Sequence, residues 1–212
     1  MSDLHYFRAD WIQPTDERIV TDVCIYGGTS AGLVAAMEAR RQGKTVLVLQ
    51  PGKFLGGLTT GGLGWTDHGR KHVIGGLSRE FYRRVGRLYG KDEEFMFEPH
   101  IAAAVYEDLL RQFDVPVRLC QYVEAVEKDG DRLRAIVLRG GLRVQARVFI
   151  DATYEGDLMA RAGVRYTVGR EGNDVYGETL NGIQVKPKHQ FTDPVDPFVR
   201  EGDPASGLLQ RI

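Results

Sequence analysis

Two apolar runs separated by an alanine-rich stretch stand near the start of the chain. Residues 21–26 and 45–49 are largely apolar, which is typical of strands buried on both faces of a sheet. Residues 33–42 between them have the composition of a helix, and Gly43 follows where a helix usually ends. The pattern predicts a strand, a helix and a parallel strand in one β-α-β unit.

Helical spacing returns after a glycine-rich stretch at residues 52–76. Apolar residues three or four positions apart predict one helix over residues 77–89 and another over residues 98–113. Residues 115–119 form a short apolar run, which predicts a third strand of the core.

The pattern changes at residue 122 to short segments divided by turn residues. Glycine-containing pairs at 129–130 and 140–141 are typical of tight turns between strands. Residues 147–151 are apolar again and are expected to return to the parallel sheet as a separate strand. Before that return, three strands of an antiparallel meander are predicted, at residues 122–128, 132–138 and 142–146.

The pattern weakens towards the end of the chain. A short helix is predicted at residues 155–162, and residues 166–172 and 176–185 suggest a hairpin. Residues 186–212 carry four prolines and no periodicity, and such a stretch does not close a compact domain. We therefore expect the chain to be a fragment that stops inside a second region.

Composition excludes several classes of function. Lysine and arginine number 28 and aspartate and glutamate 29, so the net charge of −1 gives no basis for nucleic-acid binding. No apolar run approaches the ~20 residues that span a membrane, and the polar N-terminus lacks the apolar core of a signal peptide. We therefore expect a cytoplasmic protein without nucleic-acid or membrane partners. Cys24 and Cys120 form no metal or redox motif, so we expect structural cysteines and no metal site.

The turn after the first strand carries the most informative local motif. Gly27 and Gly32 hold the first and third positions of the G-x-G-x-x-G spacing, with Thr29 at the middle position. Such a turn leads into a helix N-terminus, where unpaired N–H groups and a partial positive charge bind a pyrophosphate. We expect the hydroxyls of Thr29 and Ser30 to donate to phosphate oxygens. The motif predicts a dinucleotide site, and the alternative is a purely structural glycine turn.

The second strand ends at Gln50 instead of the acid that usually binds ribose hydroxyls. An amide still forms hydrogen bonds with a hydroxyl but brings no charge. No arginine follows directly, so a 2′-phosphate is not indicated.

Further short segments accompany this turn along the chain: residues 26–33, 50–52, 56–67, 151–158, 189–191 and 194–197. Together they resemble the FAD-dependent oxidoreductase family with a glutathione-reductase-type FAD domain, over nearly the whole chain from about residue 21. The run at 56–67 is the most specific of them. Members of that family usually have Glu where this chain has Gln50, and they continue well past residue 212.

The resemblance implies FAD as the cofactor and an α/β fold: a Rossmann-like FAD-binding domain whose parallel sheet carries an antiparallel β-meander, with the start of a second, substrate-facing region. The order of elements agrees, because an NAD-binding domain would continue with repeated βα units. The implied division is an N-terminal extension at residues 1–20, the FAD-binding domain at 21–163 and a truncated substrate or cap region at 164–212.

The resemblance also implies a set of cofactor contacts. Glycine suits the loop beside the flavin because the backbone must lie close to a flat ring. Val123 is expected to offer backbone groups to the adenine, and Ala152 and Thr153 to end the returning strand against the cofactor. The full set is Gly27, Gly28, Thr29, Ser30, Ala31, Gly32, Gln50, Pro51, Gly56, Gly57, Leu58, Thr59, Val123, Ala152 and Thr153.

No pattern identifies catalytic residues. Asp67, His68 and His72 follow the loop that should reach the flavin, and a histidine there can move protons near neutral pH. His189 lies in one of the matching segments. An isolated histidine in a polar loop is more often solvated or structural, so the catalytic residues stay unassigned.

The function implied is an FAD-dependent oxidoreductase acting on a small organic molecule. Two alternatives stay open: a dinucleotide-binding module without activity of its own, and a non-catalytic interaction domain that has kept the fold. As a fragment, the chain is expected to be inactive alone. The sequence identifies neither the substrate, nor the electron acceptor, nor the oligomeric state.

Overall fold

The computed structural model of the chain describes residues 8–182 and 196–209. The chain divides into two compact units, Met1–Arg165 and Tyr166–Ile212. Within the described residues, the first unit holds a six-stranded sheet and the second a two-stranded one.

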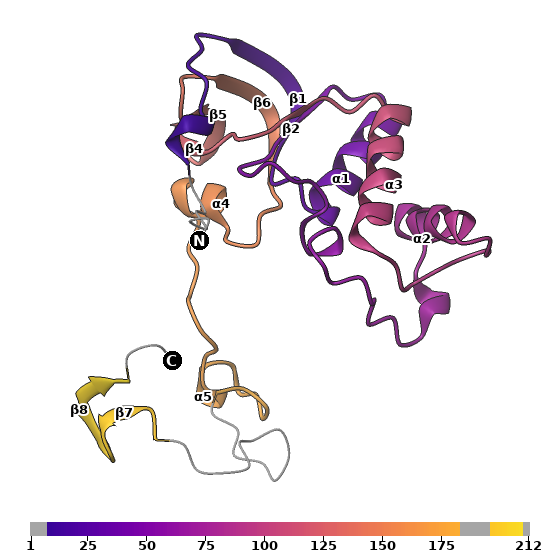
Figure 1. The fold of residues 1–212 in the computed structure, drawn as a ribbon. Coiled ribbons are helices and arrows are strands. Elements are labelled where there is room, and N and C mark those ends of the chain that lie inside the picture. The colour runs from indigo at the N-terminus through magenta and orange to yellow at the C-terminus, as the bar shows by residue number, and fades with distance from the viewer. Residues whose placement is uncertain (1–7, 183–195, 210–212) are drawn as a thin grey trace. The chain divides into compact units, whose positions relative to one another are not determined.

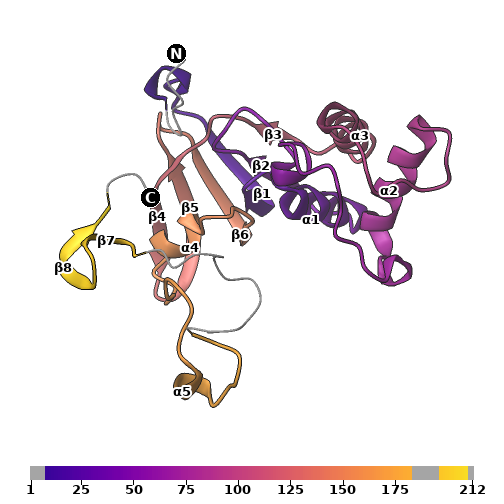
Figure 2. The same cartoon turned by 60° about the horizontal axis from the view of Figure 1, so that its bottom comes forward.

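The sheet of the first unit combines parallel and antiparallel strands. Its central strand, β1, lies between β2 and β6 and is parallel to both, and β3 is parallel to β2. The pairs β4–β5 and β5–β6 are antiparallel, so the strand order is β3, β2, β1, β6, β5, β4 (Figure 2). The predicted α/β fold, a parallel sheet with an antiparallel meander, is confirmed. The strands are β1 (Arg18–Tyr26), β2 (Val46–Leu49), β3 (Val117–Arg118), β4 (Val123–Asp129), β5 (Arg132–Leu138) and β6 (Arg143–Asp151).

The longer helices of the first unit form where the hydrophobic spacing predicts them. At the start of α1 the Thr29 side chain accepts a hydrogen bond from the N–H of Gly32, and Gly43 follows the helix with a φ of 75°. Pro99 opens α3, where its missing N–H removes no helical hydrogen bond. The helices are α1 (Ser30–Arg41), α2 (Gly76–Leu88), α3 (Pro99–Gln112) and α4 (Asp157–Arg161).

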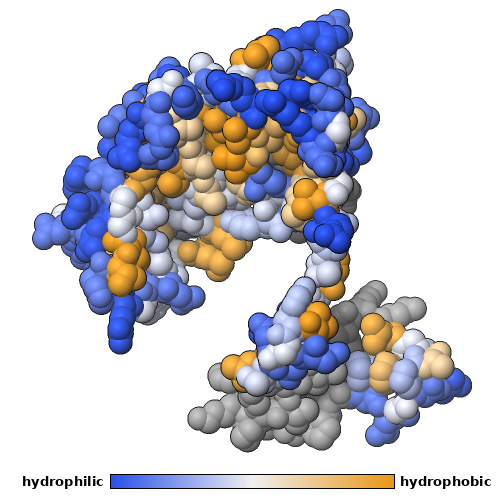
Figure 3. Space-filling model, turned by 180° about the vertical axis from the view of Figure 1, so that it is seen from behind, coloured by the Kyte–Doolittle hydropathy of each residue, from blue (hydrophilic) through white to orange (hydrophobic). Residues whose placement is uncertain are grey.

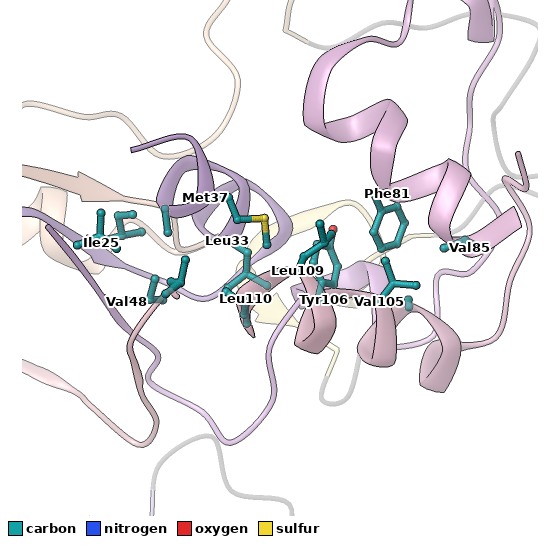
Figure 4. Packing of buried hydrophobic residues seen from close by; sticks show 14 of the residues in the cluster. Ile25, Leu33, Met37, Val48, Phe81, Val85, Val105, Tyr106, Leu109 and Leu110 are labelled. Atoms are coloured by element: carbon teal, nitrogen blue, oxygen red, sulfur yellow. The ribbon is translucent and has the colours of Figure 1, made fainter. Parts of the chain in front are cut away.

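Alternate residues of the central strands enter two different cores. Val23 and Ile25 of β1, with Val48 of β2, face the side of the sheet on which α1 and α3 lie (Figure 1). There they join side chains from α1, α2 and α3, among them Leu33 and Phe81 (Figure 4). This burial accounts for one half of each apolar run.

The second core lies on the opposite face, against the meander. Cys24 and Tyr26 of β1 pack there with Leu49 of β2 and Ile136 of β5. Because both faces are covered, successive residues of β1 and β2 are apolar. Cys24 is fully buried, as its predicted structural role requires, and burial raises the pKa of its thiol to about 12. Cys24 and Cys120 are both free thiols.

Strand β6 differs from the prediction. The expected meander strand at 142–146 and the expected returning strand at 147–151 are one continuous strand, Arg143–Asp151. Its first residues pair with β5, and nearly its whole length pairs with β1 (Figure 1). No turn residue separates the two halves, so the change in pattern marks a change of neighbouring strand. β1 also begins earlier than predicted, at Arg18, because residues 18–20 pair with the start of β6.

The second unit contains little regular structure. The predicted hairpin is wrong for residues 166–182, which contain the short helix α5 (Asn173–Tyr176) and no strand. Asn181 is buried in this segment and its side-chain oxygen accepts two hydrogen bonds from Arg170. The expectation of a tail without periodic structure is also wrong in part, because β7 (Phe198–Arg200) and β8 (Asp203–Leu208) pair as an antiparallel hairpin.

The surface of the first unit is not uniformly polar. Seen from behind, an apolar area fills the hollow in its middle and hydrophilic side chains border it (Figure 3). Among the described residues, the second half of β6 pairs with no strand other than β1, and Val148 there is exposed. None of the helices formed by the described residues is long and apolar enough to cross a membrane.

Candidate functional site

The turn between β1 and α1 is held closely against the end of β6. The N–H of Ala152 donates to the carbonyl oxygen of Tyr26, and the hydroxyl of Thr29 donates to the carbonyl oxygen of Ala152 at 2.7 Å. A Cβ at Gly27 would lie 2.6 Å from the Ala152–Thr153 peptide, and its φ of 109° also favours glycine. Glycine at this position therefore lets two backbone segments touch.

Thr29 is turned into the protein. It is buried, its hydroxyl proton is directed to Ala152, and its oxygen caps α1 at Gly32. The expected donation of this hydroxyl to a phosphate is therefore not available in the observed conformation. The hydroxyl of Thr29 thus fixes the turn by linking it to Ala152 and Gly32.

Gln50 connects the turn to the end of β2. Its side-chain oxygen accepts a 2.6 Å hydrogen bond from the N–H of Gly28, and its backbone N–H donates to the carbonyl oxygen of Arg118. Because the side-chain oxygen is engaged with Gly28, the side-chain amide nitrogen is the group that can donate to a ligand. An acid at this position would offer an acceptor where this chain offers a donor.

The start of the glycine-rich loop is joined to the same turn. The N–H of Gly56 donates to the carbonyl oxygen of Gly28, and the hydroxyl of Ser30 donates to the carbonyl oxygen of Gly56. The hydroxyls of Ser30 and Thr59 lie 2.7 Å apart. Residues far apart in the sequence thus form one surface at the N-terminus of α1.

Tyr154 and Tyr106 both interact with residues of this surface. The Tyr154 hydroxyl accepts a hydrogen bond of 2.8 Å from the N–H of Leu58. Burial raises the pKa of the Tyr106 hydroxyl, while the hydroxyls of Ser30 and Thr59 act in the opposite direction. The Tyr106 hydroxyl therefore stays protonated around neutral pH.

The segment after β6 is shaped by Asp151. Its carboxylate accepts hydrogen bonds from the N–H and hydroxyl of Thr153 and from the N–H of Met159 at the start of α4. The Thr153 hydroxyl oxygen in turn accepts from the N–H of Gly156. This network holds residues 152–156 in a fixed turn beside Gly27.

A cavity of about 330 Å³ opens between these segments. That volume is at the lower end of the range for ligand pockets. It lies at the N-terminus of α1, where N–H groups and the helix dipole favour an anion. Lys53 adds a positive charge, and Glu155 adds a negative one. The lining residues are Trp11, Gly27, Thr29, Gln50, Pro51, Gly52, Lys53, Phe54, Gly57, Thr153, Tyr154 and Glu155.

The residues of the predicted set take three kinds of position. Some line the cavity: Gly27, Thr29, Gln50, Pro51, Gly57 and Thr153. Others lie at the turn or in the segments packed against it: Gly28, Ser30, Ala31, Gly32, Gly56, Leu58, Thr59 and Ala152. Val123 is apart from the cavity lining, and its N–H donates to the hydroxyl of Tyr26 at 3.0 Å. An adenine contact through that N–H is therefore not open in this conformation.

The candidate acid–base residues are not in the cavity. Asp67 and His72 are exposed, and the His68 ring packs edge-on against Phe95 with ring centres 5.1 Å apart. His189 lies outside the described residues. Among the residues that the structure describes, no group of three or more His, Cys, Asp or Glu side chains is arranged to hold a metal ion.

Sequence reasoning missed several residues of the cavity. Tyr154 and Glu155 belong to a segment that carried the family resemblance, so that segment was a usable signal. Gly52, Lys53 and Phe54 follow Pro51 directly in the loop. Trp11 had no signal, because it lies in a polar stretch far from the turn in sequence.

Comparison with known proteins gives one family match. Residues 22–205 match the model of the family described as FAD dependent oxidoreductase. No curated protein matches the sequence.

Solved structures are similar at the level of the fold. An L-proline dehydrogenase from P. horikoshii has a TM-score of 0.55 and 12% identity, over 73% of this chain and 59% of that one. A flavin-dependent brominase has a TM-score of 0.50 and 18% identity, over 72% and 42%. A flavin-containing monooxygenase from Stenotrophomonas maltophilia has a TM-score of 0.45 and 22% identity, over 74% and 43%. The chain thus spans less than two thirds of each of these proteins.

Proposed function

The chain belongs to the FAD dependent oxidoreductase family, whose cofactor is FAD, and we propose that its first unit binds the nucleotide part of that cofactor for the redox chemistry of a small organic substrate. The observation that carries the proposal is the cavity at the N-terminus of α1, lined by the turn, the end of β2 and the glycine-rich loop. Three separate segments converge there on one anion-binding helix end.

The residues present fit a dinucleotide. The start of α1 offers backbone N–H groups to a pyrophosphate, and Lys53 supplies a cation beside them. The amide nitrogen of Gln50 is placed at the end of β2, where ribose hydroxyls are bound in folds of this kind. Fixed backbone at Gly27 and Gly28 keeps these groups in place before a ligand arrives.

In the proposed site each segment has its own task. The turn at residues 27–32 binds the phosphates. Gly32 lets the helix α1 pack closely against the turn, and the side chain of Thr29 holds the turn in place. Residues 56–59, tied to Ser30 and Tyr154, position the backbone beside the flavin end of the cofactor. Bound FAD supplies the hydride-accepting ring, and the chain supplies orientation and shielding from water.

Cofactor identity is tested first on the chain itself. The purified chain is incubated with FAD and separately with NAD, passed over a sizing column, and the retained nucleotide is identified by its visible spectrum and its mass. We expect retained FAD. Retention of NAD with no affinity for FAD would overturn the proposal.

A matched pair of serine variants tests the site. Ser30→Ala removes the hydrogen bonds to Gly56 and Thr59, and loss of about 1 kcal/mol per bond lowers FAD affinity roughly 5- to 30-fold. Ser78→Ala, at an exposed position of α2, makes the same chemical change away from the cavity and leaves affinity unchanged. Equal affinities of the two variants would remove Ser30 from the site.

Redox activity needs a separate measurement. Anaerobic reduction of the loaded chain is followed at the flavin absorption band with a panel of small organic donors. Substrate-dependent bleaching supports the oxidoreductase proposal. Tight binding without bleaching by any donor supports the alternative, a dinucleotide-binding module without activity of its own.

A further inference from the structure

An N-terminal arm, residues 8–17, crosses the first unit ahead of β1 and reaches the nucleotide cavity. It begins with a single 3-10 turn at Ala9–Trp11 that places Trp11 at the cavity lining. The family match begins only at residue 22, so Trp11 comes from a segment outside it.

The arm is anchored by backbone contacts to the turn between β5 and β6. The N–H of Thr15 donates to the carbonyl oxygen of Gly140 at 2.7 Å. A Cβ at Gly140 would lie 2.8 Å from the Gln13 carbonyl oxygen, and one at Gly141 would lie 2.4 Å from that of Thr15. Glycines at this turn therefore let the arm lie directly on it, which fixes the path towards the cavity.

Trp11 and Lys53 form one cationic and aromatic wall. The Lys53 ammonium lies 4.1 Å from the centre of the Trp11 ring, a cation–π contact, and both residues line the cavity. Arg8 lies 5.7 Å from the same ring and is paired with Asp10 at 3.0 Å. Asp10 offsets the charge of Arg8, and Lys53 and Glu155 bring one charge of each sign to the cavity lining.

The wall stands at the nucleoside side of the cavity. Trp11 and Lys53 line it together with Gln50, Pro51 and Gly52, which directly follow β2, the strand whose end meets the ribose in this kind of fold. An aromatic ring beside a cation suits a purine base linked to a phosphate, because bases stack on aromatic rings and phosphates pair with ammonium groups.

We propose that the N-terminal arm is part of the cofactor site, with Trp11 covering the adenosine of the bound dinucleotide and Lys53 neutralising its phosphates. The inference rests on the proposed function, since it names further residues of the same site. The arm then completes a cavity that the β-α-β unit leaves open on one side.

The two tryptophans of the chain make a direct test possible. In a Trp65→Phe background, Trp11 is the single tryptophan, and FAD and ADP are titrated separately against its fluorescence. We expect its emission to change at saturation with either ligand. Trp11→Ala weakens FAD and ADP binding in parallel by about 5- to 100-fold, the range for lost stacking on a base. Trp11→Phe retains most of the affinity, and far-UV circular dichroism of each variant verifies that the fold is kept.

Lys53 is tested by charge. Lys53→Met lowers the affinity for FAD and for ADP and removes the part of the salt dependence of binding that Lys53 contributes. Lys53→Arg keeps the affinities and the salt dependence. Lys44→Met, a lysine away from this cavity, is the matched control.

The outcomes separate the two proposals. Trp11→Ala with unchanged FAD and ADP affinity overturns the role of the arm while leaving FAD binding intact. Loss for FAD but not for ADP places Trp11 at the flavin half and overturns the adenosine assignment. A chain that binds ADP through Trp11 but not FAD keeps this inference and refutes the proposed cofactor, and a chain that binds neither refutes both.

Discussion

Two glycine-rich stretches of the first unit use glycine for different reasons. In the turn after β1, residues 27–32, an added Cβ at Gly27, Gly28 or Gly32 would lie 2.6 Å or less from another atom. In the outer loop, residues 69–76, an added Cβ at Gly69, Gly75 or Gly76 would meet no atom within 4 Å. Glycine in the turn makes room for close packing, whereas glycine in the outer loop does not.

This difference shows which part of the site is held in place without a ligand. The turn is joined to β2, β6 and the start of the glycine-rich loop by hydrogen bonds over long sequence separations. Dense contacts of this kind raise the free energy of local opening, and their absence lowers it. Substitutions should therefore be costly in the turn and nearly neutral at Gly75 of the outer loop, where the backbone is extended and a Cβ meets open space.

The largest effect is expected at Gly32. In Gly32→Ala the new Cβ would lie 2.0 Å from the carbonyl oxygen of Gly27, so backbone must move. We expect a loss of about 3 kcal/mol or more in the free energy of unfolding, at the upper end for overpacking, together with loss of FAD retention. Urea denaturation measures the first and the flavin spectrum the second. The damage comes from the contact of helix and turn, so even the smallest side chain suffices.

Gly75→Ala is the control for this substitution. Gly75 has an extended backbone, with φ of −136°, and open space around its Cα. A loss there as large as that of Gly32→Ala would contradict the distinction between the two stretches.

A smaller effect is expected at Gly28, because its nearest neighbour is a flexible side chain. A Cβ there would lie 2.5 Å from the Cδ2 atom of Leu55. We expect Gly28→Ala to reduce the free energy of unfolding by roughly 1 to 2 kcal/mol. In a Leu55→Ala background the same change should be close to neutral, which a double-mutant cycle measures as coupling. Additive losses would show that the backbone, not Leu55, limits the space.

An effect of pH on stability is expected where the loop between the two stretches pairs with residues 94–97. Gly64 and Thr66 form backbone hydrogen bonds with Phe97 and Phe95, and Glu94 holds that second segment. The Lys91 ammonium and then the N–H groups of Met96 and Phe95 lower the pKa of Glu94 to about 2.

The sign follows from the lowered pKa. The stabilisation by Glu94 is complete above its ordinary pKa of 4.5 and is lost as pH falls through the folded value of about 2. The stability difference between the native chain and Glu94→Gln should therefore shrink as the pH falls from 5 to 2, as urea titrations at each pH can measure. A difference that stays constant over that range would show that Glu94 does not anchor the segment.

The smallest effect is expected at the start of α2. Gly75 is the N-cap of this helix and forms no side-chain hydrogen bond there. Gly75→Ser adds a hydroxyl that accepts from the first turn, so we expect a gain of about a few tenths of a kcal/mol. Gly75→Ala lacks that hydroxyl and should fall below the serine variant in thermal unfolding. Destabilisation by serine would indicate that the outer loop is packed more closely than its open surroundings suggest.

The sequence predicted the elements well where local pattern decides them. The βαβ unit, the helices α2 and α3 and the meander follow from the spacing of apolar residues, because burial on one face of a helix or both faces of a strand imposes a fixed period. It did not predict that β6 is one strand. Both halves of β6 have strand periodicity, and a change of neighbouring strand leaves no signal that local pattern distinguishes from a turn.

The sequence by itself thus determined the fold class, the turn at residues 27–32 and the family. Only the tertiary structure decided how the side chains of the site are used. Thr29 donates to Ala152, 123 positions away, and Tyr154 accepts from Leu58, 96 positions away. Trp11 lines the cavity, and the arm that carries it lies on the turn at residues 140–141. The partner of a hydroxyl or a ring is the group that the folded chain places within a few ångströms of it. The local sequence pattern does not specify which distant segment that will be.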